Sequence, residues 1–410
     1  MKTSSEQNQQ NMQSTRNSPS DNLQKKSLVA LVKCKSYDFA EVESAVERGI
    51  ELLGGLSALF QKGESIILKP NLLSRHKPEY GVTTHPAVFR AVAKKLLSEA
   101  INASYGDSPP ADKFANISQV AGLTAVAKEL KIPVADFETG TSVYSDGGEQ
   151  RRQFNIASSI LSADGLINLP KLKTHHLTRL TGAVKNLFGC VPGFQKPEFH
   201  VKLPAVADFS KMLVDLNLLI RQRLVIMDAV QAMQGNGPTF GSLVPLHLLI
   251  LSTDPVSVDS TACRIINVPP ELVLTNYYGE KFGLGNMEAE NITIVGDPIS
   301  DFYRPDFIVQ RSQELRFNQA WKYRLTKNYV STRPVIDSKK CTLCGACVRQ
   351  CPMSPKALNW TKGHNRPPKY DYTQCIRCFC CQEVCPSGAI TGENPLLRRM
   401  IEKMYRLGVL

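Results

Sequence analysis

The residues best suited to chemistry in this 410-residue sequence are eight cysteines near its end. They form two runs of one spacing: three cysteines two residues apart, a fourth after three more residues, and then a proline. The runs are Cys341-x2-Cys344-x2-Cys347-x3-Cys351-Pro352 and Cys375-x2-Cys378-x2-Cys381-x3-Cys385-Pro386. Because thiolates are metal ligands, the repeated spacing predicts a metal-binding segment.

Both runs match the spacing of bacterial two-cluster ferredoxins, and this part of the chain resembles that family. In such ferredoxins three close thiolates hold one [4Fe-4S] cluster, and the fourth cysteine of each run ligates the other cluster. The resemblance therefore implies two [4Fe-4S] clusters with crossed ligation. One would be held by Cys341, Cys344, Cys347 and Cys385, and the other by Cys375, Cys378, Cys381 and Cys351. The prolines prevent a helix from starting at the last cysteine of each run.

Two other uses of these cysteines are less compatible with the spacing. Structural zinc sites usually pair two C-x2-C knuckles across a longer spacer, without a third cysteine at this distance. Disulfides need an oxidising compartment, and the N-terminus lacks the features of a signal peptide. Cys380 lies outside the ligand spacing, and we expect a packing thiol near a cluster, with a redox role as the alternative.

The composition indicates a folded chain with room for two or three domains. Hydrophobic residues make up 42% of it, without a run of eighteen apolar residues, so we expect no membrane span. Residues 1–26 are rich in Ser, Asn and Gln and are predicted to be a disordered tail. Twelve cysteines without a signal peptide favour a reducing, cytoplasmic location.

The chain is basic, with a formal net charge of +12. Two oxidised clusters on eight thiolates would lower this to about +8. Residues 331–410 contain thirteen Lys and Arg against five Asp and Glu, which leaves this part at about +4 with clusters bound. Such a basic surface suits an acidic redox partner, an anionic substrate or an anionic membrane surface. A solvated basic surface without a partner is the alternative.

Strand-like and helix-like segments alternate upstream of the cysteines. The predicted strands are residues 27–33, 65–69, 101–105, 132–137, 166–169, 223–228, 244–251 and 291–295. The predicted helices are residues 37–60, 86–99, 115–130, 181–187, 209–220 and 255–266. This alternation predicts an α/β fold with a largely parallel sheet and crossover helices. In such sheets chemistry gathers at the carboxyl ends of the strands.

The expected domain organisation follows from these patterns. An α/β domain would span residues 27–303, and a basic linker helix residues 304–333. A small α+β two-cluster ferredoxin-like domain would span residues 334–392. An amphipathic helix within residues 393–410 would dock on that domain, with membrane contact as the alternative.

Five polar stretches fall near the predicted strand ends. They are KPNLL (69–73), GVTTHP (81–86), KLKTH (171–175) with TGAVKNLFG (181–189), Asp228 with GNGPTFG (235–241), and DPVSVD (254–259). Together they resemble the family called domain of unknown function 362, which is often joined to a two-cluster ferredoxin module. Gln234 departs from the acidic residue expected before the GNGP stretch. The resemblance implies an architecture and a redox association, and it implies no particular substrate.

Candidate ligand-binding residues lie in these stretches. Long lysines at strand ends suit the capture of phosphate or carboxylate groups, and successive glycine N–H groups can form an anion nest. The candidates are Lys69, Asn71, Lys171, Lys173, Lys185, Asn186, Gly235, Asn236 and Gly237. The alternative for the glycine stretch is a simple turn.

Four further residues are candidates for catalysis. His85 and His175 could act as general acid or base or as metal ligands, and the alternative for each is a hydrogen-bonded structural histidine. Asp107 and Asp228 could bind a metal or orient a histidine, although such residues more commonly cap loops. Asp254 is predicted to cap a helix.

These features favour a redox enzyme. We expect two [4Fe-4S] clusters to pass single electrons between an external donor, such as a ferredoxin or flavodoxin, and an anionic small molecule on the α/β domain. The alternative is a non-catalytic iron–sulfur protein for binding, sensing or assembly. Nucleic-acid binding is not expected, because no basic recognition helix or aromatic-studded basic strand is evident.

Overall fold

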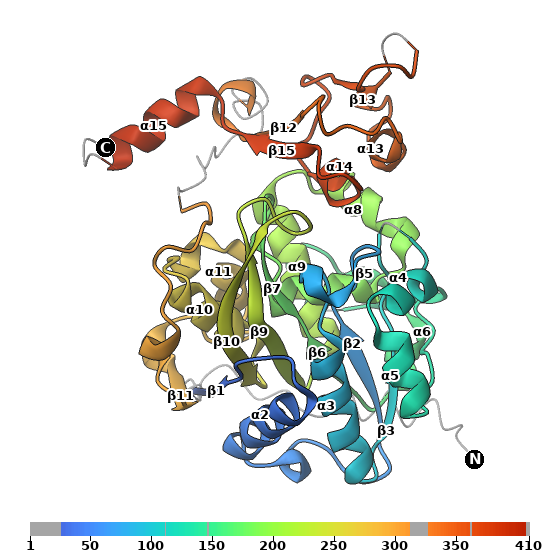
Figure 1. The fold of residues 1–410 in the computed structure, drawn as a ribbon, viewed down its shortest axis with the longest axis vertical. Coiled ribbons are helices and arrows are strands. Elements are labelled where there is room, and N and C mark those ends of the chain that lie inside the picture. The colour runs from blue at the N-terminus through green and yellow to red at the C-terminus, as the bar shows by residue number, and fades with distance from the viewer. Residues whose placement is uncertain (1–25, 111, 146, 312–326, 361–362, 407–410) are drawn as a thin grey trace.

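The computed structural model describes residues 26–110, 112–145, 147–311, 327–360 and 363–406. Within these residues, nine strands form one sheet, in which the order of seven is β11-β1-β10-β9-β6-β2-β3, with β7 beside β9 and β8 beside β7 (Figure 1). The strands are β1 (Ser27–Lys33), β2 (Ser65–Pro70), β3 (Asn102–Tyr105), β6 (Gly165–Leu169), β7 (Lys171–His175), β8 (Arg179–Leu180), β9 (Leu224–Gln234), β10 (Ser242–Ser252) and β11 (Ile292–Gly296). A separate hairpin pairs β4 (Gly140–Tyr144) with β5 (Gln153–Ala157).

The predicted α/β fold with a largely parallel sheet is confirmed. The parallel pairs are β1–β11, β2–β3, β2–β6, β6–β9 and β7–β9. Only β10 among the long strands runs against its neighbours, β1 and β9, in the described structure. The reason is the short connection at residues 235–241, since a brief loop joins antiparallel strands while a parallel pair needs a long crossover.

Helices cover both faces of the sheet (Figure 1). One face carries α2 (Phe39–Leu52), α3 (Pro86–Ser98), α4 (Phe114–Val120) and α5 (Leu123–Glu129), and the other α7 (Ala183–Asn186), α9 (Val206–Ile220), α10 (Pro255–Ile265) and α11 (Leu274–Lys281). In β1, Ala30 and Val32 pack toward the first layer, and Val29 and Leu31 toward the second. Burial on both faces explains why such strands read as continuous apolar runs.

Short elements complete the α/β domain. They are α6 (Ser158–Ser162), α8 (Lys196–Lys202) and the 3-10 helices at Leu56–Ala58, Pro78–Tyr80, Leu187–Cys190, Gly193–Gln195, Pro270–Leu272, Ala289–Asn291 and Ile299–Phe302. The predicted cap of α10 is confirmed, because Asp254 Oδ1 accepts the N–H groups of Val256 at 2.8 Å and Ser257 at 3.0 Å.

Two predicted elements were wrong in extent. The helix expected over residues 37–60 ends at Leu52, ahead of Gly54 and Gly55, which have φ values of 99° and 87°. The strand expected over residues 132–137 reduces to a single bridge between Val134 and Tyr105. The causes differ: the glycines with positive φ end the helix, and residues 132–137 lack the pairing that a strand needs despite their apolar pattern.

Two further differences concern the candidate site. Residues 171–175, which follow the strand predicted at residues 166–169, themselves form β7, so alternate side chains share one face of the strand. The strand expected to end at Asp228 continues to Gln234. Asp228 therefore lies inside β9. Its N–H donates to the carbonyl oxygen of Pro170, the residue that joins β6 to β7, at 2.9 Å.

The C-terminal domain is small and lies at the carboxyl end of the parallel strands, where its helix α14 faces α8 (Figure 1). Its elements are β12 (Arg333–Ile336), paired antiparallel with β15 (Ile390–Glu393), β13 (Leu358–Asn359), paired antiparallel with β14 (Lys369–Tyr370), and the short helices α13 (Ala346–Gln350) and α14 (Cys380–Glu383). Helix α15 (Leu396–Arg406) points away from the rest of the molecule.

Parts of three predictions lie outside the described residues. These are nearly all of the tail at residues 1–26, the segment 312–326 of the linker helix, and the last four residues of the chain. Among the helices that the structure describes, none is both long and apolar enough to cross a membrane.

Candidate functional site

The two cysteine runs follow the same backbone path. In each run the residues on either side of the second cysteine lie in the left-handed region, with φ values of 58° and 70° for Leu343 and Gly345, and 63° and 61° for Arg377 and Phe379. A short helix, α13 or α14, then carries the third cysteine and ends before the Cys-Pro pair. The equal spacing of the two runs thus corresponds to equal local structure.

One cavity tests whether these residues fit an iron–sulfur cluster. Its volume is about 20 Å³, and its wall includes the four cysteines Cys341, Cys344, Cys347 and Cys385. Cys385 comes from the second run and the other three from the first, which is the crossed set that the ferredoxin rule assigns to one cluster. The remaining wall is mostly apolar, with Ile336, Leu343, Pro368, Ala389 and Ile390. The residues present therefore fit a [4Fe-4S] cluster.

The two alternatives for the cysteines fit less well. All twelve cysteines are free thiols in the structure. Within the described residues, no three His, Cys, Asp or Glu side chains converge closely enough to hold a single metal ion, whereas a zinc site would bring its ligands to about 2.3 Å from one point.

The second cysteine run contacts the α/β domain directly. The Phe379 ring stacks on His176 with 4.8 Å between ring centroids. Gln382 Nε2 donates to Asn236 Oδ1 at 2.6 Å and to Gly237 O at 3.2 Å. Glu383 lies 2.7 Å from His175 Nε2. Helix α14 and the loop before it therefore form part of the interface between the domains.

The predicted anion nest at residues 235–237 lies in this interface. The N–H of Gly235 donates to Ile308 O at 2.8 Å, and the N–H of Gly237 donates to Thr174 Oγ1 at 3.2 Å. Asn236 Oδ1 accepts hydrogen bonds from Gln382 and from His176 Nε2, the latter at 3.1 Å. The stretch therefore binds the neighbouring domain in this structure, with two of its N–H groups already occupied.

A larger cavity of about 80 Å³ opens at this junction, at the carboxyl ends of β2 and β3. The α/β domain contributes four lysines, Lys69, Lys173, Lys185 and Lys196, and the carboxylate of Asp107. From the C-terminal domain come Gln350, Cys380 and Glu383. Lysines outnumber carboxylates four to two in this wall.

Lys69 is fully engaged within the protein. Its Nζ lies 2.9 Å from Asp107 Oδ1 and donates to Pro70 O at 2.9 Å and to Asn186 Oδ1 at 3.3 Å. Asp107 in turn accepts the N–H groups of Leu72 and Ser108, each at 2.8 Å. This buried pair holds the ends of β2 and β3 together, so its role is to shape the cavity.

The other three lysines lack a carboxylate partner among the described residues. Lys173 Nζ donates to Val82 O at 2.5 Å, and Lys196 Nζ donates to Ser108 O. Burial lowers the pKa of Lys196 to about 8, and burial together with the charges of Lys185 and Lys171 lowers the pKa of Lys173 well below its usual value. Lys185 is half-buried, and no described group accepts a hydrogen bond from it. An anion would supply the missing negative charge.

The His175–Glu383 pair has a defined protonation state at neutral pH. His175 Nδ1 accepts the N–H groups of Leu177 at 3.0 Å and Thr178 at 3.2 Å, so Nε2 carries the proton and donates to Glu383. Burial lowers the pKa of His175 to about 4. Burial also acts to raise the pKa of Glu383, but the His175 hydrogen bond and the charge of Lys185 outweigh it and lower that pKa to about 2. Glu383 is therefore a carboxylate beside a neutral imidazole.

An amide ladder forms another part of the wall. Asn71 Nδ2 donates to Asn186 Oδ1 at 3.1 Å, and Asn186 Nδ2 donates to Asn168 Oδ1 at 2.7 Å. Asn71 Oδ1 is buried and has no hydrogen-bond partner among the described residues. Since an unsatisfied buried acceptor is costly, this oxygen is suited to a donor group on a bound molecule.

Besides residues 235–237, four of the predicted candidates do not line this cavity. Lys171 Nζ lies 2.9 Å from Asp228 Oδ2. The Tyr37 hydroxyl donates to Asp228 Oδ1 at 2.8 Å, and the Tyr37 ring stacks on His85 at 3.6 Å. Asp228 also accepts the His85 N–H at 3.0 Å, and His85 caps α3 through its Nδ1. These residues form a separate, charge-balanced network. His175 does not line the cavity but contacts Glu383, which does.

Sequence patterns missed three residues of the cavity wall. Lys196 and His200 lie on α8, where the His200 ring stacks on Phe209 at 4.5 Å and burial lowers its pKa to about 4. Glu383 lies between two cysteines of the second run. A basic residue flanked by prolines and aromatics was the available signal for Lys196, whereas nothing in the sequence linked Glu383 to a cavity on another domain.

Comparisons with known proteins agree with this architecture. Residues 66–264 match the family described as Domain of unknown function (DUF362), and residues 333–386 match a 4Fe-4S dicluster domain. A thylakoid-associated protein of Synechocystis sp. is 32% identical over 263 residues, which make up 64% of this chain and 81% of that protein.

Other similarities are shorter or more distant. An uncharacterized ferredoxin of Methanocaldococcus jannaschii is 40% identical over 57 residues, 14% of this chain and 71% of that protein. The pyruvate synthase subunit PorD of that organism is 35% identical over 66 residues, 16% of this chain and 72% of the subunit. The lactate racemase apoprotein of Thermoanaerobacterium thermosaccharolyticum aligns with a TM-score of 0.38 and 13% identity, over 58% of this chain and 57% of that one. The C-terminal domain is thus an iron–sulfur electron-transfer module of the 4Fe-4S type.

Proposed function

The chain belongs to the domain of unknown function 362 family and carries a 4Fe-4S dicluster domain, and from this premise we propose that it passes single electrons to or from an anionic small molecule. The molecule would bind in the lysine-lined cavity between the domains. Two [4Fe-4S] clusters, held by the crossed cysteine sets, would supply one-electron transfer. An external protein such as a ferredoxin or flavodoxin would donate the electrons.

One observation carries this proposal: the second cysteine run forms part of the cavity wall. Cys380 and Glu383 lie within two residues of the predicted ligand Cys381, and both line the same cavity as Lys173, Lys185 and Lys196. A molecule bound to those lysines would therefore sit beside a predicted cluster site. Joining the redox module to the binding domain in one chain also raises its effective concentration.

Each group in the wall has a distinct task in this proposal. Lys173, Lys185 and Lys196 neutralise a phosphate or carboxylate group. Asn71 Oδ1 accepts a hydrogen bond from the bound molecule, and Glu383 opposes anions that would bind too close to the interface. In each transfer the donor loses one electron and the bound molecule gains one, so no other oxidant or reductant is required.

The test is the substitution Lys185→Ala in protein reconstituted with iron and sulfide under anaerobic conditions. Losing one charged hydrogen-bond donor should weaken binding of inorganic phosphate or acetate by about 2 kcal/mol, or roughly thirtyfold. Titration calorimetry measures the affinity, and iron analysis should give the same content as the wild type.

Lys202→Ala provides the matched control, because Lys202 lies on α8 with Lys196 but does not line the cavity. Its affinity for both anions should equal that of the wild type. Equal affinities for wild type and Lys185→Ala would show that the cavity is not the anion site.

A further inference from the structure

The two cysteine runs face different surroundings. Toward the larger cavity, the C-terminal domain presents Gln350, which precedes Cys351, and Cys380, which precedes Cys381. Cys351 and Cys381 belong to one predicted cluster under the crossed rule. The cluster nearest the cavity is therefore the one assigned to Cys375, Cys378, Cys381 and Cys351.

The other predicted cluster site reaches the surface. Cys344, one of its four cysteines, is exposed, as is its neighbour Thr342, and both line the smaller cavity. Cys375 and Cys381 of the second run are buried. An external protein can thus approach the first run more closely than the second.

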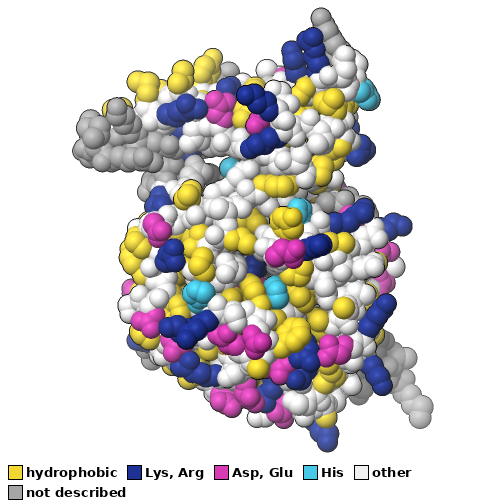
Figure 2. All heavy atoms as spheres, in the orientation of Figure 1, with side chains coloured by type: hydrophobic (Ala, Val, Ile, Leu, Met, Phe, Trp, Pro, Cys, Tyr) yellow, Lys and Arg dark blue, Asp and Glu magenta, His cyan; other side chains and the backbone are white. Residues whose placement is uncertain are grey.

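Exposed cations surround this surface-reaching site. Lys339 and Lys340 directly precede Cys341, and Arg349 Nη1 donates to Cys344 O at 3.1 Å. Arg366 and Lys369 flank the Pro367-Pro368 pair, of which Pro368 lines the smaller cavity. We refer to Lys339, Lys340, Arg349, Arg366 and Lys369 as the basic surface. Figure 2 shows Lys and Arg side chains gathered over the C-terminal domain.

Little negative charge offsets these cations. Asp337 lies 3.9 Å from Lys340, and both side chains are largely solvent-accessible, so screening weakens this pair. A positive patch of this kind attracts a partner with a negative patch and raises its association rate.

We propose that the basic surface is the docking site of an acidic electron-carrier protein, so that electrons enter at the cluster site of Cys341, Cys344, Cys347 and Cys385 and leave at the site beside the larger cavity. The carrier loses one electron for each electron that the bound molecule gains. The docking step depends only on the C-terminal domain, whereas the exit step rests on the proposed function.

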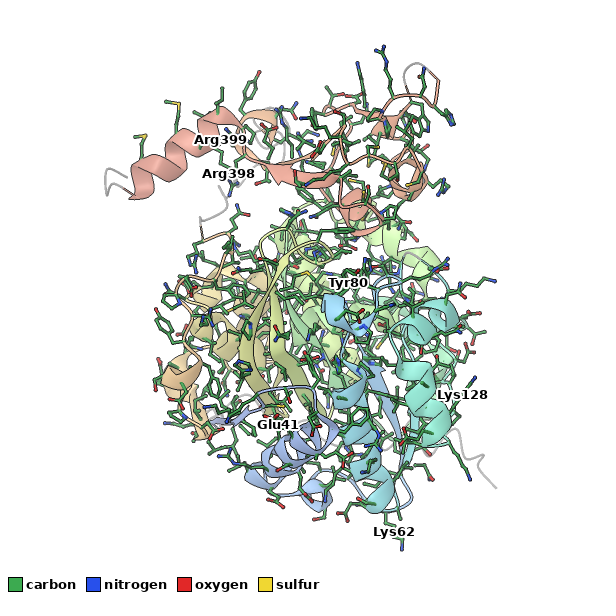
Figure 3. The ribbon with its side chains drawn as sticks, viewed as in Figure 1. Glu41, Lys62, Tyr80, Lys128, Arg398 and Arg399 are labelled. Carbon is green, nitrogen blue, oxygen red and sulfur yellow. The ribbon has the colours of Figure 1, made fainter. Side chains whose placement is uncertain are left out.

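The experiment compares two double charge reversals in cluster-loaded protein. Lys339→Glu with Lys340→Glu changes the basic surface. Lys62→Glu with Lys128→Glu makes the same charge change on the α/β domain, and Figure 3 shows both of these lysines away from the C-terminal domain. The probe is reduced flavodoxin, an acidic one-electron carrier, and stopped-flow absorbance gives the second-order rate constant of cluster reduction.

At low ionic strength the Lys339/Lys340 variant should be reduced by flavodoxin at least tenfold more slowly than the wild type. The Lys62/Lys128 variant should stay within about twofold of the wild type, because those lysines lie on the α/β domain, away from the docking site (Figure 3). Dithionite, a small reductant, should reduce all three proteins at similar rates, and iron content should be equal.

Proton NMR gives a second readout that does not depend on turnover. The cysteine β-proton signals that each cluster shifts can be assigned to that cluster with one ligand variant, such as Cys378→Ser, in which the signals of the lost cluster disappear together. Adding oxidised flavodoxin should perturb the signals of Cys341, Cys344 and Cys347, and adding inorganic phosphate should perturb those of Cys378 and Cys381.

Each contrary result has a definite meaning. Equal slowing in both double variants, or slowing with dithionite as well, would overturn the docking site. Flavodoxin-induced changes in the signals of Cys378 and Cys381 would overturn the proposed direction of electron transfer between the two cluster sites. Absence of phosphate binding with an intact flavodoxin effect would refute the proposed function and leave the docking site standing.

Discussion

The two cysteine runs share a backbone and differ in the residues between their ligands. The first run has Gly345 and Ala346 after its second cysteine, and the second has Phe379 and Cys380 at the same places. Gly345 lines the smaller cavity, whereas Phe379 stacks on His176 and Cys380 lines the larger cavity. The comparison teaches that cysteine spacing sets the ligand geometry, while the intervening residues decide which run contacts the α/β domain.

Phe379 shows this division of roles most clearly. A left-handed backbone costs a non-glycine residue of order 1–3 kcal/mol, and Phe379 adopts φ 61° where the first run uses glycine. Its ring is 3% exposed, and burying a phenyl ring contributes about 1.5–3 kcal/mol, with a further 0.5–1.5 kcal/mol from stacking. Interdomain packing thus offsets the local strain.

The largest expected effect is a difference in iron content between two variants of the second cysteine run, one at a predicted ligand and one at a neighbouring cysteine. Cys378→Ser should lose about one cluster, or roughly four irons, because it removes a predicted ligand. Cys380→Ser should keep the wild-type iron content, since Cys380 lies outside the spacing. Iron and sulfide analysis after anaerobic reconstitution measures both. If Cys380→Ser lost iron to the same extent as Cys378→Ser, the assigned ligand set would be wrong.

An intermediate effect is expected from Phe379→Gly, which gives the second run the glycine of the first. The variant relieves backbone strain but loses the buried ring, so docking of the domains should weaken by about 2 kcal/mol. Differential scanning calorimetry of loaded protein should then show two separated unfolding transitions, with iron content unchanged.

Leu343→Gly is the control for that variant, because Leu343 has the same left-handed backbone in the first run and lines the smaller cavity, whose described wall comes from the C-terminal domain alone. It should leave the coupling of the domains as in the wild type. If the Phe379→Gly protein showed the same unfolding transitions as the wild type, the stacking of Phe379 on His176 would not be what holds the domains together.

The smallest expected effect is the pH dependence of anion binding in the larger cavity. The lowered pKa of Lys196, about 8 because of burial, means that its charge is present below pH 8 and is lost as pH rises. Asp107, Lys69, Lys185 and the Cys190 thiol are the ionisable groups that act on it. Sulfate, which does not titrate in this range, should bind roughly fivefold more weakly at pH 9 than at pH 8.

Lys196→Arg tests the assignment of this titration, since arginine keeps its charge throughout the range. Sulfate affinity in that variant should change little between pH 8 and pH 9. A wild-type fall that persists in Lys196→Arg would assign the titration to another group.

Much of the architecture could be predicted from the sequence because its signals are local. Alternation of apolar segments predicted the α/β fold, and the capping pattern at Asp254 predicted the start of α10. The resemblance in cysteine spacing implied that Cys385 shares a cluster with the first three cysteines of the first run. In the structure, these four cysteines line the same cavity. In each of these cases, the sequence pattern and the structure it predicts depend on residues that are close together in the sequence.

The candidate site was less predictable because its chemistry depends on partners distant in sequence. Lys171 and Lys173 look alike in the sequence, yet Lys171 pairs with Asp228 while Lys173 lines the cavity with Lys185. Glu383 reaches its place only because α14 packs against His175. Pairing across domains decides which charges are available to a ligand, and no local pattern records it.

The wall of the larger cavity has one more consequence, which concerns assembly. Gln350, Cys380 and Glu383 all lie within the cysteine runs, and segments of this kind acquire their shape when their inorganic core is inserted. A chain without its clusters would lack the part of the larger cavity wall that the C-terminal domain contributes. Under the proposed function, insertion of the clusters and binding of the anionic molecule are therefore linked, so a chain without its clusters would not bind that molecule.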